Sequence, residues 1–382
     1  MAGAGIGADV FKGDRLISWK EVAAHLGCSV ATAQRWERQE GLPVHRHVHQ
    51  KLGSIIAFRS EIDRWASERG RRSPSSASEP RRVSLAVLPF ANYTGDARKE
   101  YLCDGVTEEL ITELGRRFSD RLKLIARTSV MQFKCTHEPV DRIARQLEVG
   151  HIIEGSISAA GAEFRVSAQL IEAAGQRHIW ADSFPGKLRD LFAIAKAIAS
   201  HCAERLDLTT ADAGLLQQRV VISAAYDHYL QARFHWFQLT RDAIDRALHH
   251  YEQALRHDPN FGAAYAGVSA VWQVRGDSGY VAPAEAYPYA RDAASRALAL
   301  SPDSAFVRGV YAYLRFEYEW DMEGALAEGE RALALNGSDV NVHLLLWDCH
   351  VSARRFREAG EHIEACLKLD PYNPFFKCFY GW

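Results

Sequence analysis

Three histidines near the amino end alternate along the sequence and are candidates for metal binding. His45, His47 and His49 would project from one face of an extended strand, because successive side chains of a strand point to opposite faces. Imidazole nitrogens bind zinc, but no cysteine lies nearby and a fourth ligand is not evident. The alternative, which we favour, is a row of exposed imidazoles with Val44 and Val48 turned inward. We therefore expect no bound metal and no cofactor.

Two further groups have residue types that catalysis uses. Asp104, Glu108 and Glu109 could act as paired carboxylates, although their place near the start of a predicted helix favours capping and a stabilising interaction with the helix dipole. Residues 127 to 129, Arg-Thr-Ser, follow a predicted buried strand and could line an anion site or form an ordinary strand end. No nucleophile paired with a base and no phosphate loop stands out. We therefore expect a protein that is not an enzyme.

The basic residues with the most specific spacing lie between residues 18 and 40. Apolar residues at helical spacing occur on both sides of a Gly-Cys-Ser break, which predicts two short helices joined by a tight turn. Gly27 would permit the turn, and Ser29 would cap the second helix. The outer side of that helix would carry short polar residues first and cations further along, which suits a helix in a DNA major groove. The residues on this side are Ser29, Ala31, Thr32, Gln34, Arg35 and Arg38.

The stretch after these helices adds a family resemblance. GLPVHRHVHQKLGSIIAFRSEIDRWASER predicts two short strands around a Lys-Leu-Gly-Ser turn and then a helix capped by Ser60. With the preceding helices it resembles the winged helix-turn-helix of the MerR and excisionase group, at positions Leu42, Pro43, Arg46, Arg59, Ser60, Glu61, Ile62 and Trp65. The resemblance implies DNA binding by residues 1 to 70, with Arg46, Lys51 and Arg59 of the wing near phosphate or the minor groove. The alternative is a module retained for protein contacts.

Charge and composition agree with this division. The 382 residues have a net charge of −2, yet residues 1 to 82 hold 14 Lys and Arg against 9 Asp and Glu, which favours a nucleic-acid partner for the amino end. Residues 71 to 82, RRSPSSASEPRR, have no apolar anchor and predict a solvated linker. The seven cysteines are widely spaced, as is typical of reduced cytosolic thiols, and no segment has the ~18 apolar residues of a membrane span. We expect a soluble, cytoplasmic protein that does not enter the membrane.

Residues 83 to 210 alternate strand and helix patterns and predict one α/β domain with a mixed sheet. Among its segments, VSLAVLPF predicts a first strand and LKLIARTSV (residues 122 to 130) a second one. Its segments VSLAVLPFANYTGD, DGVTEELITEL, IIEGSI and VSAQLIEAAGQRHIWAD resemble the TolB amino-terminal-like domain, which is related to FlgO. In bacteria that domain often lies between a DNA-binding or cyclase domain and tetratricopeptide repeats. The resemblance implies an accessory or ligand-sensing module rather than a defined reaction.

Residues 222 to 382 are helical throughout and repeat themselves. Two small-residue positions and a turn position recur at intervals of about 43, 35 and 34 residues, and small residues are needed where antiparallel helices cross closely. The positions are Ala247, Ala290, Ala325 and Ala359, then Ala254, Ala297, Ala332 and Cys366, then Pro259, Pro302, Gly337 and Pro371. The pattern resembles the tetratricopeptide repeat (TPR), which implies an all-α solenoid of about four repeats with a groove that binds a protein or peptide. The end, YNPFFKCFYGW, begins a further helix and predicts either a truncated product or a protein contact.

The fold that we predict is therefore multidomain, α and α/β. The function that we predict is a DNA-binding transcriptional regulator of bacterial type, with an accessory or sensor α/β domain and repeats that recruit a partner. The alternative is a cytoplasmic TPR scaffold whose winged module binds protein rather than DNA. A lone winged module makes few phosphate contacts, so we also expect a homo-oligomer that brings two copies to double-stranded DNA.

Overall fold

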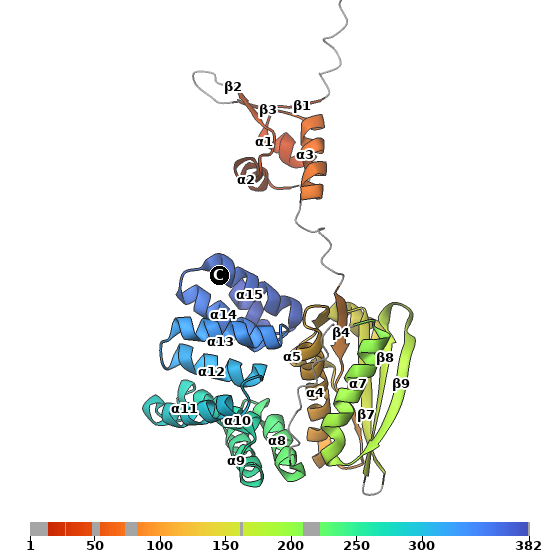
Figure 1. Cartoon of the computed structure of the whole chain (residues 1–382). Coiled ribbons are helices and arrows are strands. Elements are labelled where there is room, and N and C mark those ends of the chain that lie inside the picture. The colour runs from red at the N-terminus through yellow and green to blue at the C-terminus, as the bar shows by residue number, and fades with distance from the viewer. Residues whose placement is uncertain are drawn as a thin grey trace, which may run out of the picture. The chain divides into compact units, whose positions relative to one another are not determined.

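The computed structural model describes residues 14–26, 28–47, 54–72, 82–160, 163–208 and 222–380. The chain divides into two compact units, Met1–Arg81 and Arg82–Trp382, and each has its own hydrophobic core (Figure 1). The predicted α/β part and the predicted repeats both lie in the second unit. The stretch 73–81, most of the predicted linker, lies outside the described residues.

The first unit contains three helices and a small antiparallel sheet of order β1-β3-β2. Its elements are β1 (Arg15–Leu16), α1 (Trp19–His25), α2 (Val30–Glu40), β2 (His45–His47), β3 (Ser54–Phe58) and α3 (Arg59–Arg72). The apolar residues that predicted two facing helices do meet: Val22, Ala23 and Ala33 are buried, and Trp36 packs against Trp65 with ring centroids 6.0 Å apart. Residues 18 to 40 are thus two helices rather than one rod.

The start of α3 differs from the prediction, because Ser60 does not cap it. The helix begins at Arg59, and Asp14 takes the capping role from the segment before β1. The carboxylate of Asp14 accepts the Ser60 backbone N–H at 3.1 Å and the Ser60 hydroxyl at 2.6 Å. The two-residue strand β1 that brings Asp14 there is too short to produce a periodic pattern in the sequence.

The α/β part of the second unit is a mixed sheet of order β6-β4-β7-β8-β9, with β5 also paired to β7. Parallel pairs join β4 to β6 and β7, and β7, β8 and β9 form an antiparallel meander. The elements are β4 (Val83–Val87), β5 (Ala91–Tyr93), α4 (Glu100–Phe118), β6 (Leu122–Leu124), α5 (Arg127–Val130), α6 (Val140–Leu147), β7 (His151–Ala160), β8 (Glu163–Glu172), β9 (Arg177–Gly186) and α7 (Leu191–Arg205). The predicted strand at 122–130 was wrong in its second half, which is helix α5.

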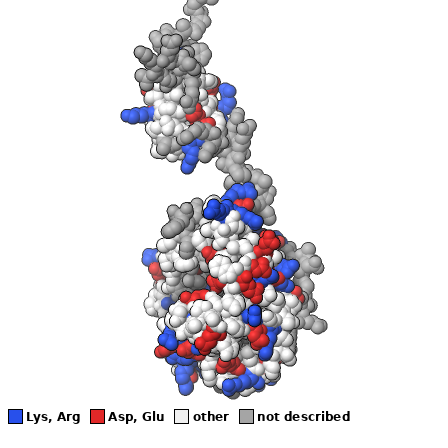
Figure 2. Space-filling model, turned by 90° about the vertical axis from the view of Figure 1, so that its left-hand side faces the viewer, with Lys and Arg blue, Asp and Glu red and all other residues white. Residues whose placement is uncertain are grey.

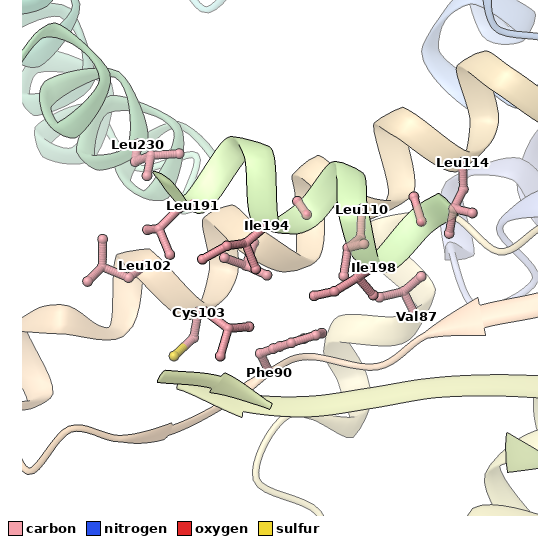
Figure 3. Close-up of a cluster of buried hydrophobic side chains, with 14 of the residues drawn as sticks. Val87, Phe90, Leu102, Cys103, Leu110, Leu114, Leu191, Ile194, Ile198 and Leu230 are labelled. Atoms are coloured by element: carbon pink, nitrogen blue, oxygen red, sulfur yellow. The ribbon is translucent and has the colours of Figure 1, made fainter. Parts of the chain in front are cut away.

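Helices α4 and α7 cover one face of this sheet and bury a core of Leu, Ile, Val and Phe side chains between them and the strands (Figure 3). The same core continues into the first repeat helix. Leu230 lies at the edge of the cluster near Leu191 and Leu102, and its side chain occupies the space that a Cβ on Gly105 of α4 would need. The repeats and the α/β part therefore share one core.

The predicted helical repeats are confirmed. Helix hairpins follow one another: α8 (Ser223–Trp236), α9 (Arg241–His257), α10 (Gly262–Asp277), α11 (Pro283–Leu300), α12 (Ala305–Glu317), α13 (Met322–Leu335), α14 (Val340–Ser352), α15 (Phe356–Leu369) and α16 (Pro374–Tyr380). All eight small residues of the two repeating positions are buried on the second helix of a hairpin, and each predicted turn residue follows such a helix. Among the described helices, none combines the length and the apolar character that a membrane span needs.

Candidate functional sites

The outer side of α2 carries several of the predicted DNA-binding residues. Ser29 is the N-cap, and its hydroxyl accepts the backbone N–H of Thr32 at 3.1 Å and lies 2.8 Å from the Thr32 hydroxyl. Arg35, one turn further along, is exposed. Gln34 and Arg38 belong to the same helix, and the side chain of Arg38 lies outside the described part. The backbone of α2 thus presents Ser29, Thr32 and Arg35 together.

The predicted wing residues are not gathered in the same way. Arg46 pairs through its backbone with Ile55 across β2 and β3, whereas Lys51 lies outside the described residues. Arg59 is the first residue of α3, and its Nη1 is 3.5 Å from Nδ1 of His25 at the end of α1. The structure therefore places Arg59 beside α1 rather than in the hairpin.

Of the three alternating histidines, the structure describes the side chain of His45. Nε2 of His45 is 2.7 Å from a carboxylate oxygen of Glu61 on α3, and its ring meets Phe58 edge-on. His49, like Gly27 of the predicted turn, lies outside the described residues. In the part of the chain that the structure describes, no group of three or more His, Cys, Asp or Glu side chains is placed to hold a metal ion.

Two of the three candidate carboxylates of α4, Asp104 and Glu108, take part in ion pairs rather than in capping. Asp104 is buried in the second turn of the helix, where it accepts hydrogen bonds from Arg127 at 3.3 Å and from Lys134 at 2.5 Å. Glu108 pairs with Arg233 of α8, whose guanidinium also lies over the rings of Phe237 and Phe306. The capping interpretation was wrong, because all three side chains lie beyond the first turn of α4, and Asp104 and Glu108 have cationic partners.

The run at residues 127 to 129 docks the last repeat rather than lining an open anion site. Ser129 donates a 2.5 Å hydrogen bond to Asp370, in the turn between α15 and α16, and accepts the backbone N–H of Tyr372 at 3.0 Å. The backbone N–H of Ala126 donates to the carbonyl of Leu369 at 2.7 Å. Helices α8 to α16 therefore curve around α4 and α5, which contact both the first and the last repeats (Figure 1).

The turns inside three hairpins expose large apolar side chains. Leu239 is 65% exposed, Trp320 is 86% exposed and Phe356 is 67% exposed. Leu239 and Trp320 also have positive φ angles of 52° and 54°, which is uncommon for residues other than glycine. Because stacked hairpins place such turns on the same edge, we call these three residues the turn edge. The opposite turns, at Asn336 and Asp370, contact the α/β part.

Comparisons with known proteins give a limited set of similarities. No family model matches the chain. A protein of Rhizobium meliloti (strain 1021) named "Putative adenylate cyclase 3" is 31% identical over 216 residues, which are 54% of this chain and 36% of that protein. The chain thus spans about a third of the length of this relative. The name is that of an enzyme, so the match contradicts our expectation that the protein is not an enzyme.

Solved structures with partial similarity include two TPR proteins and a TolB protein. A TPR protein of Thermus thermophilus is 16% identical with a TM-score of 0.36, over 51% of this chain and 93% of that one. YrrB, described as a TPR protein with an unusual peptide-binding site, is 22% identical with a TM-score of 0.29, over 41% and 75% of the two chains. TolB of Acinetobacter baumannii is 13% identical with a TM-score of 0.25, over 33% and 28%.

Proposed function

We propose that this protein is a regulator that binds a partner protein through the helical repeats of its second unit. The observation that carries the proposal is the turn edge, where Leu239, Trp320 and Phe356 expose apolar side chains on three hairpins. Large exposed apolar side chains are typical of protein interaction sites. The inner side of the repeats is less available to a partner protein, because α4 already contacts α8 and the turn at Asn336.

The charge distribution on the second unit also favours a protein partner. On the face that Figure 2 shows, acidic and basic side chains are interspersed among uncharged ones. Nucleic acid selects continuous basic surfaces, whereas mixed charges around apolar groups suit a protein interface.

A capture experiment with matched variants tests this proposal. The full chain, a Trp320→Ser/Phe356→Ser variant and a Tyr93→Ser control would be used to isolate partners from an extract of the source organism. Tyr93 is a comparably exposed aromatic residue on β5, away from the turns. A partner that the control retains and the double variant loses supports the turn edge. Equal capture by all three proteins would refute it.

DNA binding by the first unit is a second candidate function, and a specific arrangement favours it. Two short helices pack across a tight turn, and the second presents Ser29, Thr32 and Arg35 on its outer side. Arg35→Ala should weaken binding to promoter DNA roughly 10-fold, whereas Lys20→Ala on α1 serves as the control. Equal, salt-insensitive binding by both variants would argue for a protein contact instead. Light scattering would show whether the protein is the homo-oligomer that this function requires.

The relative named as an adenylate cyclase extends the proposal to cyclic-nucleotide chemistry. Because the first unit has only 81 residues, most of the matched stretch must lie in the second unit. We therefore propose that the second unit works within a cyclase-type system. The full chain incubated with ATP and Mg²⁺ gives the direct assay. Formation of cyclic AMP would place the catalytic activity in this chain, and its absence beside an active control enzyme would restrict the shared part to partner binding.

A further inference from the structure

Two hairpins of the second unit carry the same arrangement of three histidines. His228 and His235 lie seven residues apart on α8, with His250 facing them from α9. His343 and His350 lie seven residues apart on α14, with His362 facing them from α15. The two middle histidines hold the same repeat position, each three residues after the first small residue, Ala247 or Ala359. We call these groups the first and the second triad.

The geometry inside the two triads is also the same. Nδ1 of His228 is 3.1 Å from Nδ1 of His250, and Nδ1 of His343 is 3.0 Å from Nδ1 of His362. The remaining rings, His235 and His350, stack on the middle ring with centroids 5.5 and 5.4 Å away. Their Nδ1 atoms are buried and have no hydrogen-bond partner within the described structure.

These contacts fix where the protons lie. Nε2 of His343 is 3.2 Å from the carbonyl oxygen of Gly337, which can only accept, so this nitrogen carries a proton. In the neutral ring, Nδ1 of His343 is then bare and accepts the N–H of His362. A second proton on His343 would set two N–H groups face to face unless His362 moved its own proton from Nδ1 to Nε2. The 3.1 Å contact between His228 and His250 likewise has room for one proton only.

The surroundings of the triads mostly oppose a positive charge. Burial and then the neighbouring histidines lower the pKa of both His250 and His362 to about 4, and burial also lowers the pKa of His228, His235 and His343. Around the first triad, Asp227 favours protonation, whereas Arg246, His249 and His257 oppose it. Glu358 at the start of α15 lies near His350 of the second triad, with Arg355 and Arg357 close to the same carboxylate.

Each triad is linked to a contact with α4 through a neighbouring residue. Asp227, the residue before His228, accepts a 2.6 Å hydrogen bond from the hydroxyl of Tyr101 on α4. Gly337, which holds His343, lies in the turn whose Asn336 side chain packs against Gly115 of α4. The first and the last hairpins, which both contact α4, therefore each contain a cluster of three imidazoles.

We propose that the two triads are proton-sensitive clasps, which hold the first and last repeats against α4 while their imidazoles are neutral and loosen when they gain protons. The direction follows from the lowered histidine pKa values. The clasps stabilise the contact between the repeats and α4 fully above the ordinary histidine pKa of ~6.5. This stabilisation is lost as the pH falls from there towards 4. The trigger is a proton rather than a metal ion, since the described side chains offer no metal-binding group.

Hydrogen exchange of α4 in the full chain tests the proposal. A ring with a pKa of about 4 in the clasp and ~6.5 when released shifts the opening equilibrium ~10-fold between pH 7.5 and pH 5.5. After correction for intrinsic rates, the α4 amides of the wild type should therefore lose about 10-fold protection or more at pH 5.5. A His250→Leu/His362→Leu variant should lose much less, and a His137→Leu/His178→Leu variant of two exposed histidines should behave like the wild type.

Three outcomes would overturn the proposal. One is equal loss of protection in the double variant and the wild type. A second needs no variant, and so covers the case in which the double variant does not fold: NMR titration of the wild type giving all six triad histidines pKa values near ~6.5. The third is a rise in melting temperature with Zn²⁺ at pH 7.5 in the wild type but not in a His250→Gln/His362→Gln variant, which would make the triads metal sites.

Discussion

Arg233 of α8 and Glu108 of α4 lie 125 residues apart in the sequence and form a largely buried ion pair, in which Nε of Arg233 donates to Oε1 of Glu108 at 2.8 Å. The guanidinium also lies 4.8 Å from the ring centroid of Phe237 and 4.9 Å from that of Phe306. Burial opposes the charge on Arg233, but Glu108, Tyr251 and Tyr229 together more than offset this effect, so the pKa of the guanidinium is raised. The pair thus connects the α/β part to the first and third hairpins.

Removal of one residue of this ion pair should destabilise the protein. Arg233→Met leaves the largely buried Glu108 without its hydrogen-bonded cation, and we expect a loss of about 3–5 kcal/mol in the free energy of unfolding, measured by urea denaturation of the full chain. Arg296→Met removes an exposed i,i+4 pair with Asp292 and should cost less than ~1 kcal/mol. The Glu108→Gln/Arg233→Met variant should recover part of the loss. A cost for Arg233→Met no greater than that of Arg296→Met would contradict the role of the pair.

Glu109, the next residue of α4, should make the protein less stable at high pH. Burial raises the pKa of its carboxyl group to about 8, and the nearby carboxylates Glu108 and Glu113 add to the effect. The fold therefore favours the protonated acid, so this contribution is most favourable below the ordinary pKa of 4.5 and is lost as the pH rises towards 8. Glu109→Gln should raise stability at pH 8 by roughly 1 kcal/mol or more and change little at pH 4.5.

The matched control for Glu109 is Glu330→Gln, which replaces an exposed carboxylate on α13. Thermal unfolding at both pH values should separate the two variants. If Glu109→Gln is no more stable than Glu330→Gln at pH 8, the carboxyl group of Glu109 is solvated rather than buried.

The repeats were predictable from the sequence because their packing requires small residues at regular intervals. A hairpin needs a small residue wherever its two helices cross, so positions such as Ala247 and Ala290 recur at nearly fixed intervals. The strand β4 and the helix α4 were predictable for a similar reason, since burial of one face imposes a period on the apolar residues. Periodic patterns of small and apolar residues thus predicted most of the helices and strands.

The docking of the repeats onto the α/β part produces no periodic pattern in the sequence. It depends on single contacts between distant residues, such as Glu108 with Arg233 and Ser129 with Asp370. The strand predicted at 122–130 illustrates the effect: only Leu122 to Leu124 pair with β4, and the chain then turns into α5 to reach Asp370. Contacts of this kind override the local β propensity.

The candidate DNA-binding site was predictable only in part. Ser29 caps α2 as its residue type and position indicated, because capping is a local interaction. Arg59 could not be placed in the same way, since β1 and Asp14 determine where α3 begins. The residues on α2 remain predictions until DNA binding is measured.

A substitution at Gly267 tests the close packing of α10 against α9 in the second unit. A Cβ at this position of α10 would collide with the ring of Tyr251, a fully buried residue of α9. Gly267→Ala should therefore destabilise the protein by about 1–3 kcal/mol or more, measured by urea denaturation. Gly360→Ala on α15 is the control: nothing lies within 4 Å of its Cβ, and we expect a gain of ~0.5–1 kcal/mol. Equal effects would mean that the hairpin opens easily to accept the methyl group.

Trp320 should matter for binding and not for folding. Its side chain is 86% exposed, and its φ of 54° costs a residue with a Cβ about 1 kcal/mol relative to glycine. Trp320→Gly should therefore leave the unfolding free energy unchanged or raise it by up to ~1 kcal/mol, and should reduce partner capture. Arg354→Gly relieves the same backbone conformation, with a φ of 58°, without removing an aromatic ring, so it should stabilise the protein and retain capture. If Trp320→Gly instead lost more than ~2 kcal/mol, the indole ring would be packed within the fold, and the turn edge could not be the interaction surface.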